Sequence, residues 1–449
     1  MKTTLTTALE SALDFLEGLD RNPVAPTADR ATLLSRLQSD APEEGLAPEL
    51  VIRELVHTVD GGIVGSASGR FFGWVIGGAL PAAIGADWLT SVWDNNATLY
   101  ACGPAASVIE EVCGRWLKQI LGLPGHASFA FTTGCQMAHV TCLAAARHAV
   151  LAKRGWDVEK QGLAGSPPIR VVCGDVRHGA LDRAIRLLGL GSANVVPLAD
   201  FRQLESALDG SPAIVLLQAG EINSGAFDAF EKLIPIAKAR GAWVHVDGAF
   251  GLWAAASPRY RHLVRGVQTA DSWATDGHKW LNTPFDCGYA FVIDPESHRA
   301  AMSHRASYLT HSTEARDQLE WTPEWSRRGR GFPTYAALRQ LGRKGVAEQI
   351  ENCCRHAREL VHGIARMPGV ELVSEPILNQ GLVRFTAMDT DAVIEAINQS
   401  GEAFFTGTTW RGTRAMRVSV CNWRTSDDDV RRTLHAVERI LACRATSAS

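Results

Sequence analysis

The stretch "AWVHVDGAF", residues 242–250, is a short apolar run that ends in a carboxylate, Asp247, and continues into small residues. Similar runs recur between residues 70 and 300, with helical patterns between them; they include "SFAFTTG", "RVVCGD", "AIVLLQAG" and "GYAFVID". Most of these runs do not alternate apolar with polar residues, as expected of strands whose sheet is covered by helices on both faces. The sequence therefore predicts an α/β fold with a large, mostly parallel sheet, whose ligands bind beyond the carboxyl ends of the strands.

The chain of 449 residues is too long for one ordinary core, so we expect it to be divided into parts. Residues 1–65 are helical and interrupted by prolines, which indicates an N-terminal arm. Residues 66–335 hold the large sheet domain, in which the polar, tryptophan-bearing stretch 311–332 is expected to be a mobile loop. Residues 336–449 are expected to form a small C-terminal α/β domain, because "GLVRFTA", "AVIEAINQSG" and "AMRVSVCNW" indicate strand, helix and strand.

Composition argues against several classes of protein. The residues are 46% hydrophobic and 21% charged with a net charge of −3, which leaves no basic footprint for nucleic acid or anionic membrane. The N-terminus places Leu5, Leu9, Leu13 and Leu16 on one helical face, which indicates an amphipathic helix and not a signal peptide. No stretch approaches the roughly 20 apolar residues of a membrane span. Ten scattered cysteines indicate reduced thiols, so we expect a cytoplasmic protein.

Lys279 is the first candidate for chemistry. It lies in "SWATDGHKWLN", residues 272–282, between two strand-like runs. An ammonium drawn toward an apolar wall loses solvation, so we expect its pKa to fall and the free amine to become a nucleophile. The structural alternative is a lysine at a strand end that keeps its ammonium in water.

Three further candidates also follow strands. In "FTTGCQMAH" the residues Thr133, Gly134, Cys135 and Gln136 open a helix, whose free N–H groups favour a phosphate. His178 follows "VVCGD", and Asp247 ends its own strand. Taken singly, each has a structural alternative: an ordinary turn glycine, a structural histidine or an aspartate that caps a helix.

Together these residues fit the needs of pyridoxal 5'-phosphate. Lys279 would form the Schiff base with the cofactor aldehyde, and Asp247 would pair with the pyridine nitrogen and keep it protonated. His178 would stack on the ring, and His278 would border the phosphate or the substrate.

The segment from "RFFGWVIGGALPAA" at residue 70 to "GYAFVID" at residue 294 resembles the group II pyridoxal-phosphate-dependent decarboxylases, relatives of aromatic-amino-acid and glutamate decarboxylases. "WVHVDGAF" and "DSWATDGHKWLN" are similar to the HVDAA-like and HKW-like motifs of that family, and "CGDVRH" and "LQAGEINSGAFD" are similar to two further segments. The resemblance implies fold type I (aspartate aminotransferase-like) and a homodimer whose active sites are built from both subunits.

The same resemblance assigns the remaining site residues. It places Gly134, Cys135 and Gln136 at the phosphate, Ala249 against the other ring face and Asn223 beside the ring. It also places a substrate-side group, in part from the partner subunit, at Trp74, Val75, Asn96, Thr98 and Tyr100.

Two departures from the family pattern matter. The cradle "TGCQMAH" lacks the usual small hydroxylated residues and glutamate. The family's protonating loop tyrosine is matched here by Gln318 or Leu319, while Tyr308, the nearest tyrosine, matches a different position. Proton delivery to the substrate carbanion is therefore open.

We expect the decarboxylation of an L-amino acid to its amine through Lys279. The alternative keeps the cofactor and changes the outcome at the carbanion to aldehyde-forming oxidative deamination, transamination or carbon–carbon lyase or aldolase chemistry. A silent scaffold is disfavoured because Lys279, Asp247 and His178 are all present. A nicotinamide enzyme is disfavoured because no GxGxxG follows a strand, and no metal is expected because the histidines lack ligand spacing. The sequence does not name the amino acid.

Overall fold

The computed structural model describes residues 1–304 and 315–447. The chain forms two compact units, of which the first comprises residues 1–76, 356–375 and 381–449 and the second comprises residues 77–355 and 376–380. The three-part division expected from the sequence stays a prediction. Among the described residues, no helix is both long enough and apolar enough to cross a membrane.

The second unit contains a seven-stranded sheet with the strand order β1-β7-β6-β5-β4-β2-β3. Its strands are β1 (Ser128–Thr132), β2 (Arg170–Gly174), β3 (Val195–Leu198), β4 (Ala213–Gln218), β5 (Trp243–Asp247), β6 (Ser272–Asp276) and β7 (Gly288–Val292). The neighbouring strands β3, β2, β4, β5 and β6 pair in parallel, whereas β7 runs antiparallel to both of its neighbours, β1 and β6. The mostly parallel sheet predicted from the sequence is confirmed.

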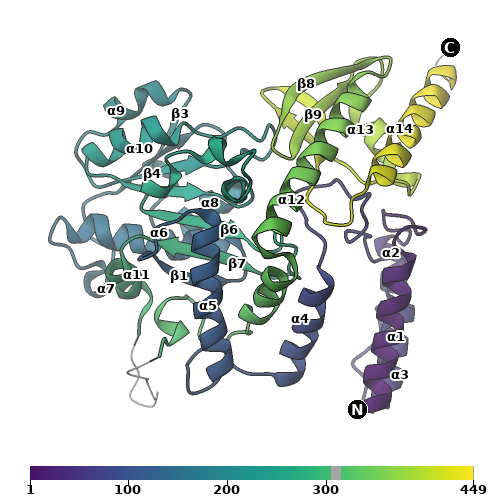
Figure 1. Ribbon diagram of the computed structural model, residues 1–449, viewed down its shortest axis with the longest axis horizontal. Helices are drawn as coiled ribbons and strands as arrows, with labels where there is room; N and C mark the ends of the chain where they lie inside the picture. Colours follow the sequence, from purple (N-terminus) through teal and green to yellow (C-terminus); the bar gives the residue numbers. More distant parts are fainter. Residues whose placement is uncertain (305–314, 448–449) are drawn as a thin grey trace. The chain divides into compact units, whose positions relative to one another are not determined.

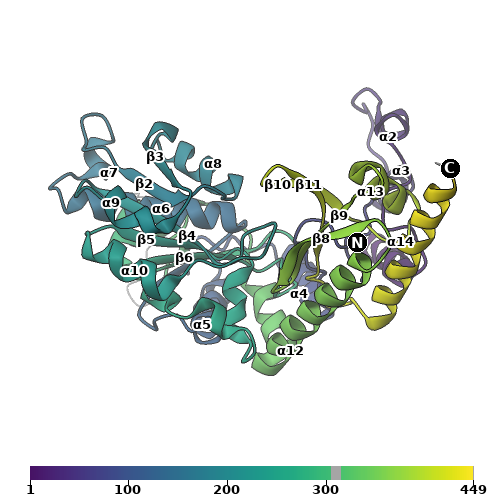
Figure 2. The same cartoon turned by 90° about the horizontal axis from the view of Figure 1, so that it is seen from above.

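Helices cover both faces of this sheet (Figures 1 and 2). In Figure 2, α6 and α8 lie on one side of the strands and α5 and α10 on the other. Every residue of β5, β6 and β7 is buried, as expected of strands in a sheet that is covered on both faces. The helices of this part of the chain are α4 (Pro81–Trp93), α5 (Pro104–Leu121), α6 (Cys135–Ala152), α7 (Val158–Gln161), α8 (Gly179–Leu187), α9 (Leu204–Ala207), α10 (Phe230–Ala239), α11 (Pro295–Met302) and α12 (Gly331–Ala365).

Short 3-10 turns connect several of these elements. They are η1 (Ser192–Asn194), η2 (Phe201–Gln203), η3 (Gly251–Ala256), η4 (Arg261–Val264), η5 (Val267–Thr269) and η6 (Gln318–Glu320). The long helix α12, expected from about residue 334, is interrupted at Gly342, whose φ of 60° lies outside the helical region.

The segment 315–332 is packed, although its polar composition suggested a solvated loop. Arg327 forms an ion pair of 2.8 Å with Glu110, and both side chains are fully buried. Asp317, Gln318 and Leu319 are also buried, because the side chain of Asp317 and the backbone of Leu319 bind the backbone of residues 98–100. The mobility expected for 311–332 stays a prediction, and residues 311–314 lie outside the described residues.

The first unit combines N-terminal helices with a second sheet. Its helices are α1 (Lys2–Gly18), α2 (Arg30–Leu37), α3 (Pro48–Thr58), α13 (Thr390–Gln399) and α14 (Asp427–Ser447). The second sheet has the order β10-β11-β9-β8 and consists of β8 (Val370–Ile377), β9 (Gln380–Phe385), β10 (Thr406–Trp410) and β11 (Thr413–Ser419). Arg70 ties this unit together, since its buried guanidinium donates to backbone carbonyls of residues 19–22 and 401–402.

Candidate active site

The candidate residues meet at one edge of the seven-stranded sheet. β5 and β6 are parallel neighbours in which Asp247 is level with Ala274, so Asp247 and the turn after Asp276 leave the sheet at the same edge. The β1–α6 turn lies at this edge as well, where it packs against Gly288, the first residue of β7. The approach is so close that a Cβ atom on Gly288 would lie 2.5 Å from Cα of Gly134. Only glycine allows that approach, and Gly134 itself has a φ of 153°.

Asn282 holds the backbone that carries Lys279. Its side-chain Nδ2 donates to the carbonyls of Lys279 at 2.9 Å and Trp280 at 3.1 Å. Its Oδ1 accepts a hydrogen bond of 2.8 Å from the backbone of Gly78, and the residue has a left-handed φ of 48° and is fully buried. The buried amide therefore fixes the direction in which the lysine leaves the strand.

The amine of Lys279 is paired with a carboxylate. Nζ lies 3.0 Å from Oδ2 of Asp276 and 5.9 Å from the centre of the Phe250 ring. Burial opposes the charged form, but Asp276 outweighs burial, and the pKa of Lys279 is raised. The expectation that desolvation lowers this pKa is therefore wrong, because the sequence argument did not include the neighbouring carboxylate.

Asp276 is a central residue that the sequence analysis missed. It is 3% exposed, and its Oδ1 accepts a hydrogen bond of 2.6 Å from the backbone N–H of Cys135 and lies 3.6 Å from Nε2 of His278. Although burial acts to raise its pKa, the charges of Lys279 and His278 prevail, and the pKa of Asp276 is lowered. The sequence does contain a signal for Asp276, since this residue ends an apolar strand just as Asp247 does.

Asp247 has one engaged oxygen and one free oxygen. Oδ1 accepts a hydrogen bond of 3.1 Å from the backbone N–H of Ala249 and lies 3.6 Å from Nε2 of His139. Oδ2 accepts no hydrogen bond from residues 1–304 or 315–447. The side chain is 9% exposed, so a nearly buried carboxylate oxygen is left for a ligand.

The predicted phosphate cradle is present at the start of α6, with one change. The N–H of Cys135 is already taken by Asp276. The backbone N–H groups of Gln136 and Met137 and the hydroxyl of Thr133 donate to no acceptor in the described part of the chain. These three groups can bind an anion, whereas Cys135 contributes its N–H to the protein itself.

The two predicted histidines have different settings. His178 is exposed at the N-terminus of α8, where its Nδ1 accepts a hydrogen bond of 3.2 Å from Ala180, so it caps that helix. His278 stacks on Phe285 with ring centres 4.2 Å apart, and burial lowers its pKa.

Asn223 and Ala249 are also placed by their own turns. Nδ2 of Asn223 donates to Glu221 at 2.6 Å, in a turn whose backbone and hydroxyl groups also bind that carboxylate. The carbonyl of Ala249 accepts a hydrogen bond of 3.0 Å from Asp276, and its N–H binds Asp247. Ala249 is thus tied to the carboxylate of Asp247 and to the backbone of Asp276.

The predicted substrate-side residues are spread over the chain. Trp74, which is 50% exposed, and buried Val75 belong to the first unit, so their role stays a prediction. The segment of Asn96, Thr98 and Tyr100 binds residues 317–327. Its expected role in a partner subunit's site also stays a prediction, and Tyr308 lies outside the described residues.

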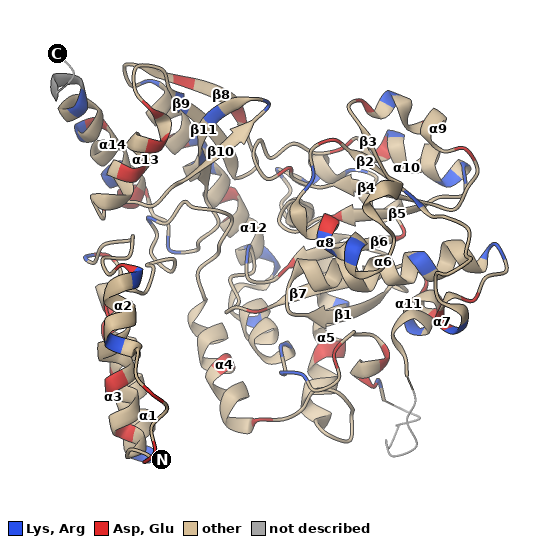
Figure 3. Cartoon of the chain, turned by 180° about the vertical axis from the view of Figure 1, so that it is seen from behind, with Lys and Arg blue, Asp and Glu red and all other residues tan. Residues whose placement is uncertain are grey.

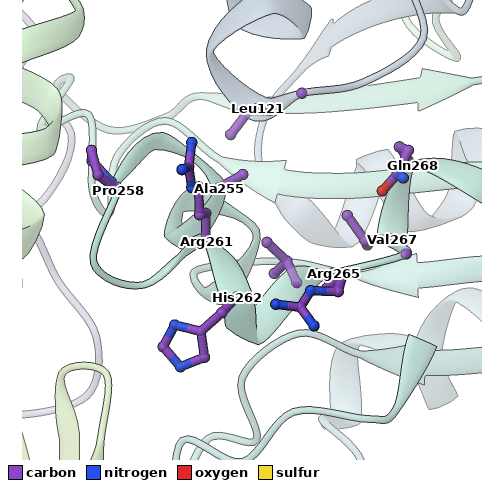
Figure 4. Close-up of a pocket in the computed structure, with 11 residues that line it drawn as sticks. Leu121, Ala255, Pro258, Arg261, His262, Arg265, Val267 and Gln268 are labelled. Atoms are coloured by element: carbon purple, nitrogen blue, oxygen red, sulfur yellow. The ribbon is translucent and has the colours of Figure 1, made fainter. Parts of the chain in front are cut away.

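A hollow of about 360 Å³ lies elsewhere, beside η3, η4 and η5. Figure 4 shows Arg261, His262 and Arg265 around it, together with Leu121 from α5. None of the predicted site residues lines this hollow. The candidate active site is therefore defined by the groups at the sheet edge and not by this hollow.

Those side chains fit pyridoxal phosphate. The lysine amine at the sheet edge suits the cofactor aldehyde, and the free N–H groups of Gln136 and Met137 suit its phosphate. The unpaired Oδ2 of Asp247 suits a protonated ring nitrogen.

Comparison with known proteins agrees with this fit. Residues 31–388 match the pyridoxal-dependent decarboxylase conserved domain. Tryptophan decarboxylase 1 of Oryza sativa subsp. japonica is 27% identical and is aligned over 92% of this chain and 88% of that protein. 4-Hydroxyphenylacetaldehyde synthase of Rhodiola rosea is 24% identical over 90% of this chain and 88% of that protein. The crystal structure of Oryza sativa TDC with PLP and tryptamine has a TM-score of 0.91 at 24% identity, covering 98% of this chain and 97% of that chain, which shows the shared fold.

The fold and the sheet-edge site define a type I pyridoxal-phosphate enzyme. Because the conserved domain spans most of the sequence, the chain belongs to the pyridoxal-dependent decarboxylase family. It is a pyridoxal-phosphate-dependent decarboxylase of an amino acid. The family, fold class, cofactor and enzyme class expected from the sequence are confirmed.

Proposed function

We propose that this enzyme removes the α-carboxylate of an L-amino acid by means of a cofactor attached to Lys279. The observation that carries this assignment is the placement of the Lys279 amine at the sheet edge, 3.0 Å from Asp276, on the strand next to the one that ends in Asp247. When bound, the cofactor supplies an electron-poor ring that accepts the electron pair left at the substrate α-carbon. The chain's own residues hold, orient and protonate the reacting groups.

The two carboxylates have different tasks in this proposal. Asp247 directs its free Oδ2 to the ring nitrogen and keeps a proton there. The carboxylate of Asp276 keeps Lys279 protonated until the cofactor arrives, and it orients the amine. His178 covers the ring face at the start of α8, and His278 borders the phosphate beside Asp276.

We propose an aromatic L-amino acid as the substrate. The support comes from the relatives, since tryptophan decarboxylase 1 and an aromatic-L-amino-acid decarboxylase of Bacillus atrophaeus both align over about nine-tenths of this chain. The test is to incubate the purified enzyme with L-tryptophan, L-tyrosine, L-phenylalanine, L-glutamate and L-histidine, and to measure carbon dioxide and amine. Release of both from an aromatic substrate supports the proposal, whereas turnover of L-glutamate alone would overturn it.

A second candidate outcome is an aldehyde product. Its support is that an aldehyde synthase of Rhodiola rosea and one of Arabidopsis thaliana are each 24% identical to this chain, close to the value for the decarboxylases. Gln318 and Leu319, which match the family's loop tyrosine, carry no side-chain acid that could protonate the substrate carbon. Measurement of ammonia, hydrogen peroxide and aldehyde beside amine separates the two outcomes.

We also propose a homodimer whose subunits share active sites. Exposed leucines recur on α1 at Leu5, Leu9 and Leu13, and α4 exposes Trp88 and Trp93. Figure 3 shows that α4 is almost free of charge, and Asp87 is its only charged residue. Such apolar faces are expected to be covered in a stable assembly.

A reducing compartment such as the cytoplasm is proposed from the thiols. The ten cysteines form no disulfide with one another, and eight of them are buried. Secreted proteins of this size tend to pair such residues as disulfides.

A further inference from the structure

A chain of buried polar side chains leads from the middle of the sheet to Asp247. We call it the buried relay, and its members are Trp243, Ser272, His245, His139, Cys135 and Asp247. Trp243, His245 and Asp247 alternate along β5 and therefore point to the same face of the sheet, which α6 covers. Each member is less than 10% exposed.

The contacts of the buried relay are continuous. Nε1 of Trp243 donates to Oγ of Ser272 at 2.9 Å, and the same Oγ lies 2.9 Å from Nδ1 of His245. Nε2 of His245 lies 2.9 Å from Nδ1 of His139.

The far end reaches Asp247 through Cys135. Nε2 of His139 lies 3.4 Å from Sγ of Cys135, and that thiol donates to Oδ1 of Asp247 at 4.0 Å. His139 also lies within ion-pair distance of the same oxygen, at 3.6 Å.

The Asp247 end fixes the direction of the bonds. A carboxylate can only accept, so the thiol of Cys135 donates to Asp247 and its sulfur accepts from Nε2 of His139. With one proton on each neutral ring, Nδ1 of His139 accepts from Nε2 of His245, and Nδ1 of His245 accepts from the hydroxyl of Ser272. This leaves the second proton of the pair on Nε2 of His139, where it faces Cys135 and Asp247.

Electrostatics favours the same arrangement. Burial lowers the pKa of both histidines, against the attraction of Asp247 and Asp276 in the case of His139, so both rings are neutral. Burial and the two carboxylates raise the pKa of Cys135 well above its usual value, so the thiol keeps its proton. A neutral relay can therefore donate to Asp247 without placing a second charge beside it.

We propose that the buried relay is a positioning device that holds Asp247 with its Oδ2 directed at the cofactor's ring nitrogen. Ser272, which accepts from Trp243, acts at a distance, because its hydroxyl donates to Nδ1 of His245 and so leaves the proton of that ring on Nε2. The inference rests on the proposed role of Asp247, but the histidine protonation that it requires can be measured separately.

The same atoms suggest one competing explanation. Sγ of Cys135, the imidazole of His139 and the carboxylate of Asp247 offer ligand atoms within 4.8 Å of one another, and Cys135 and His139 are four residues apart on α6. The sequence analysis did not consider this spacing, and the expectation that the protein holds no metal stays a prediction. A bound metal ion would replace the hydrogen bonds of the relay.

The test uses the holoenzyme with ¹⁵N-labelled histidine and ¹⁵N-labelled pyridoxal phosphate. Solid-state NMR then reports which nitrogen of each histidine carries a proton and whether the cofactor's ring nitrogen is protonated. Ser272→Ala removes the donor to His245 without touching the cofactor. Ser128→Ala is the matched control, because Ser128 of β1 forms a similar buried hydrogen bond of 2.8 Å with His298 of α11.

The relay predicts that wild-type His139 carries its proton on Nε2. Ser272→Ala should mix the two neutral forms of His139, lower the protonated fraction of the ring nitrogen and weaken cofactor binding by about five-fold, the effect of one lost hydrogen bond. Ser128→Ala should change none of these. If Ser272→Ala does not fold, Trp243→Phe removes the other end of the same donor path and is judged by the same readouts.

Three results would overturn the inference. They are an unchanged His139 in a folded Ser272→Ala enzyme, an equal response in Ser128→Ala, and a stoichiometric metal ion in the purified protein. Asp247→Asn separates the proposed role of Asp247 from the existence of the buried relay. If it leaves the ring nitrogen protonated, the proposed role of Asp247 fails, whereas the histidine signals still decide whether the relay exists.

Discussion

The amine nitrogen of Lys279 lies 3.0 Å from Oδ2 of Asp276, and this carboxylate also receives the first N–H of α6, from Cys135. Lys279 can attack the cofactor only as the free amine, and Asp276 raises its pKa. Attachment should therefore require a higher pH than an unpaired buried lysine would need. The Asp276 carboxylate therefore stabilises the protonated form of the nucleophile.

Replacement of Asp276 by asparagine tests this relationship. Asp276→Asn should lower the pKa of Lys279. The rate at which pyridoxal phosphate attaches to the cofactor-free enzyme increases as Lys279 loses its proton, so the midpoint of this increase should lie at a lower pH in the variant than in the wild type. At pH 7.5 we expect about five-fold faster attachment, because even a solvent-screened pair at this distance contributes about 1 kcal/mol. The measurement is the absorbance change on reconstitution between pH 6 and pH 10.

The control for this experiment is Asp271→Asn. Asp271 forms a similar ion pair of 3.0 Å with Lys238 just before β6, away from the site. A profile that shifts equally in both variants, or that shifts to higher pH in Asp276→Asn, would contradict the role given to Asp276.

Replacement of Asp247 by asparagine should separate binding from chemistry. The amide has nearly the same shape, so the cofactor should remain at least partly bound, while kcat should fall by about 10²–10⁴-fold because the ring nitrogen loses its proton. Absorbance of the bound cofactor and amine release measure the two effects. Asp228→Asn, which alters a carboxylate that binds the backbone of Gln218 at 2.7 Å, is the control and should keep nearly full kcat.

The exposed face of α1 should be required for assembly. Leu9→Lys places a charge on that face and should weaken dimerisation by about 10- to 100-fold, since burial of an unpaired polar group costs about 1–3 kcal/mol. Deletion of residues 1–65 should abolish the dimer and the activity together. Sedimentation velocity measures the oligomeric state and amine release measures the activity. Leu187→Lys, which alters an exposed residue of α8, is the control. A fully active monomer would refute the shared site.

Tyr308 should influence the product if it delivers the proton that Gln318 and Leu319 cannot supply. Tyr308→Phe is then expected to lower the amine fraction and raise the aldehyde fraction, which chromatography of the products measures. Tyr335→Phe, in which the altered ring stacks on Trp116, is the control. Clean amine release that neither Tyr308→Phe nor His278→Gln changes would show that another group donates the proton.

The fold could be predicted from the sequence because its signals are local. Short apolar strands such as β4 and β7 lack alternation, and this indicates a sheet covered on both faces. The antiparallel pairing of β7 with β1 joins segments that are far apart in the sequence. Periodicity does not report such pairing, so this feature needed the structure.

The site also combines features that local sequence reveals with features that depend on contacts in the folded chain. Lys279 and Asp247 could be found because each ends or follows a buried strand. The sign of the pKa change at Lys279 could not be found, because it depends on a carboxylate three residues away whose direction is set by Cys135 and His278. The histidine pair His139 and His245 joins a helix to a strand about 100 residues later, so no local pattern reveals their contact of 2.9 Å.

The most direct test of the whole account is to locate the cofactor. The purified holoenzyme is treated with borohydride, digested and mapped by mass spectrometry, and Lys279→Ala and the exposed-lysine variant Lys153→Ala are treated in parallel. The account predicts one modified peptide, which contains Lys279, in the wild type and in Lys153→Ala, and no modified peptide in Lys279→Ala. A stoichiometric adduct on any other lysine, or an unchanged adduct in Lys279→Ala, would contradict it.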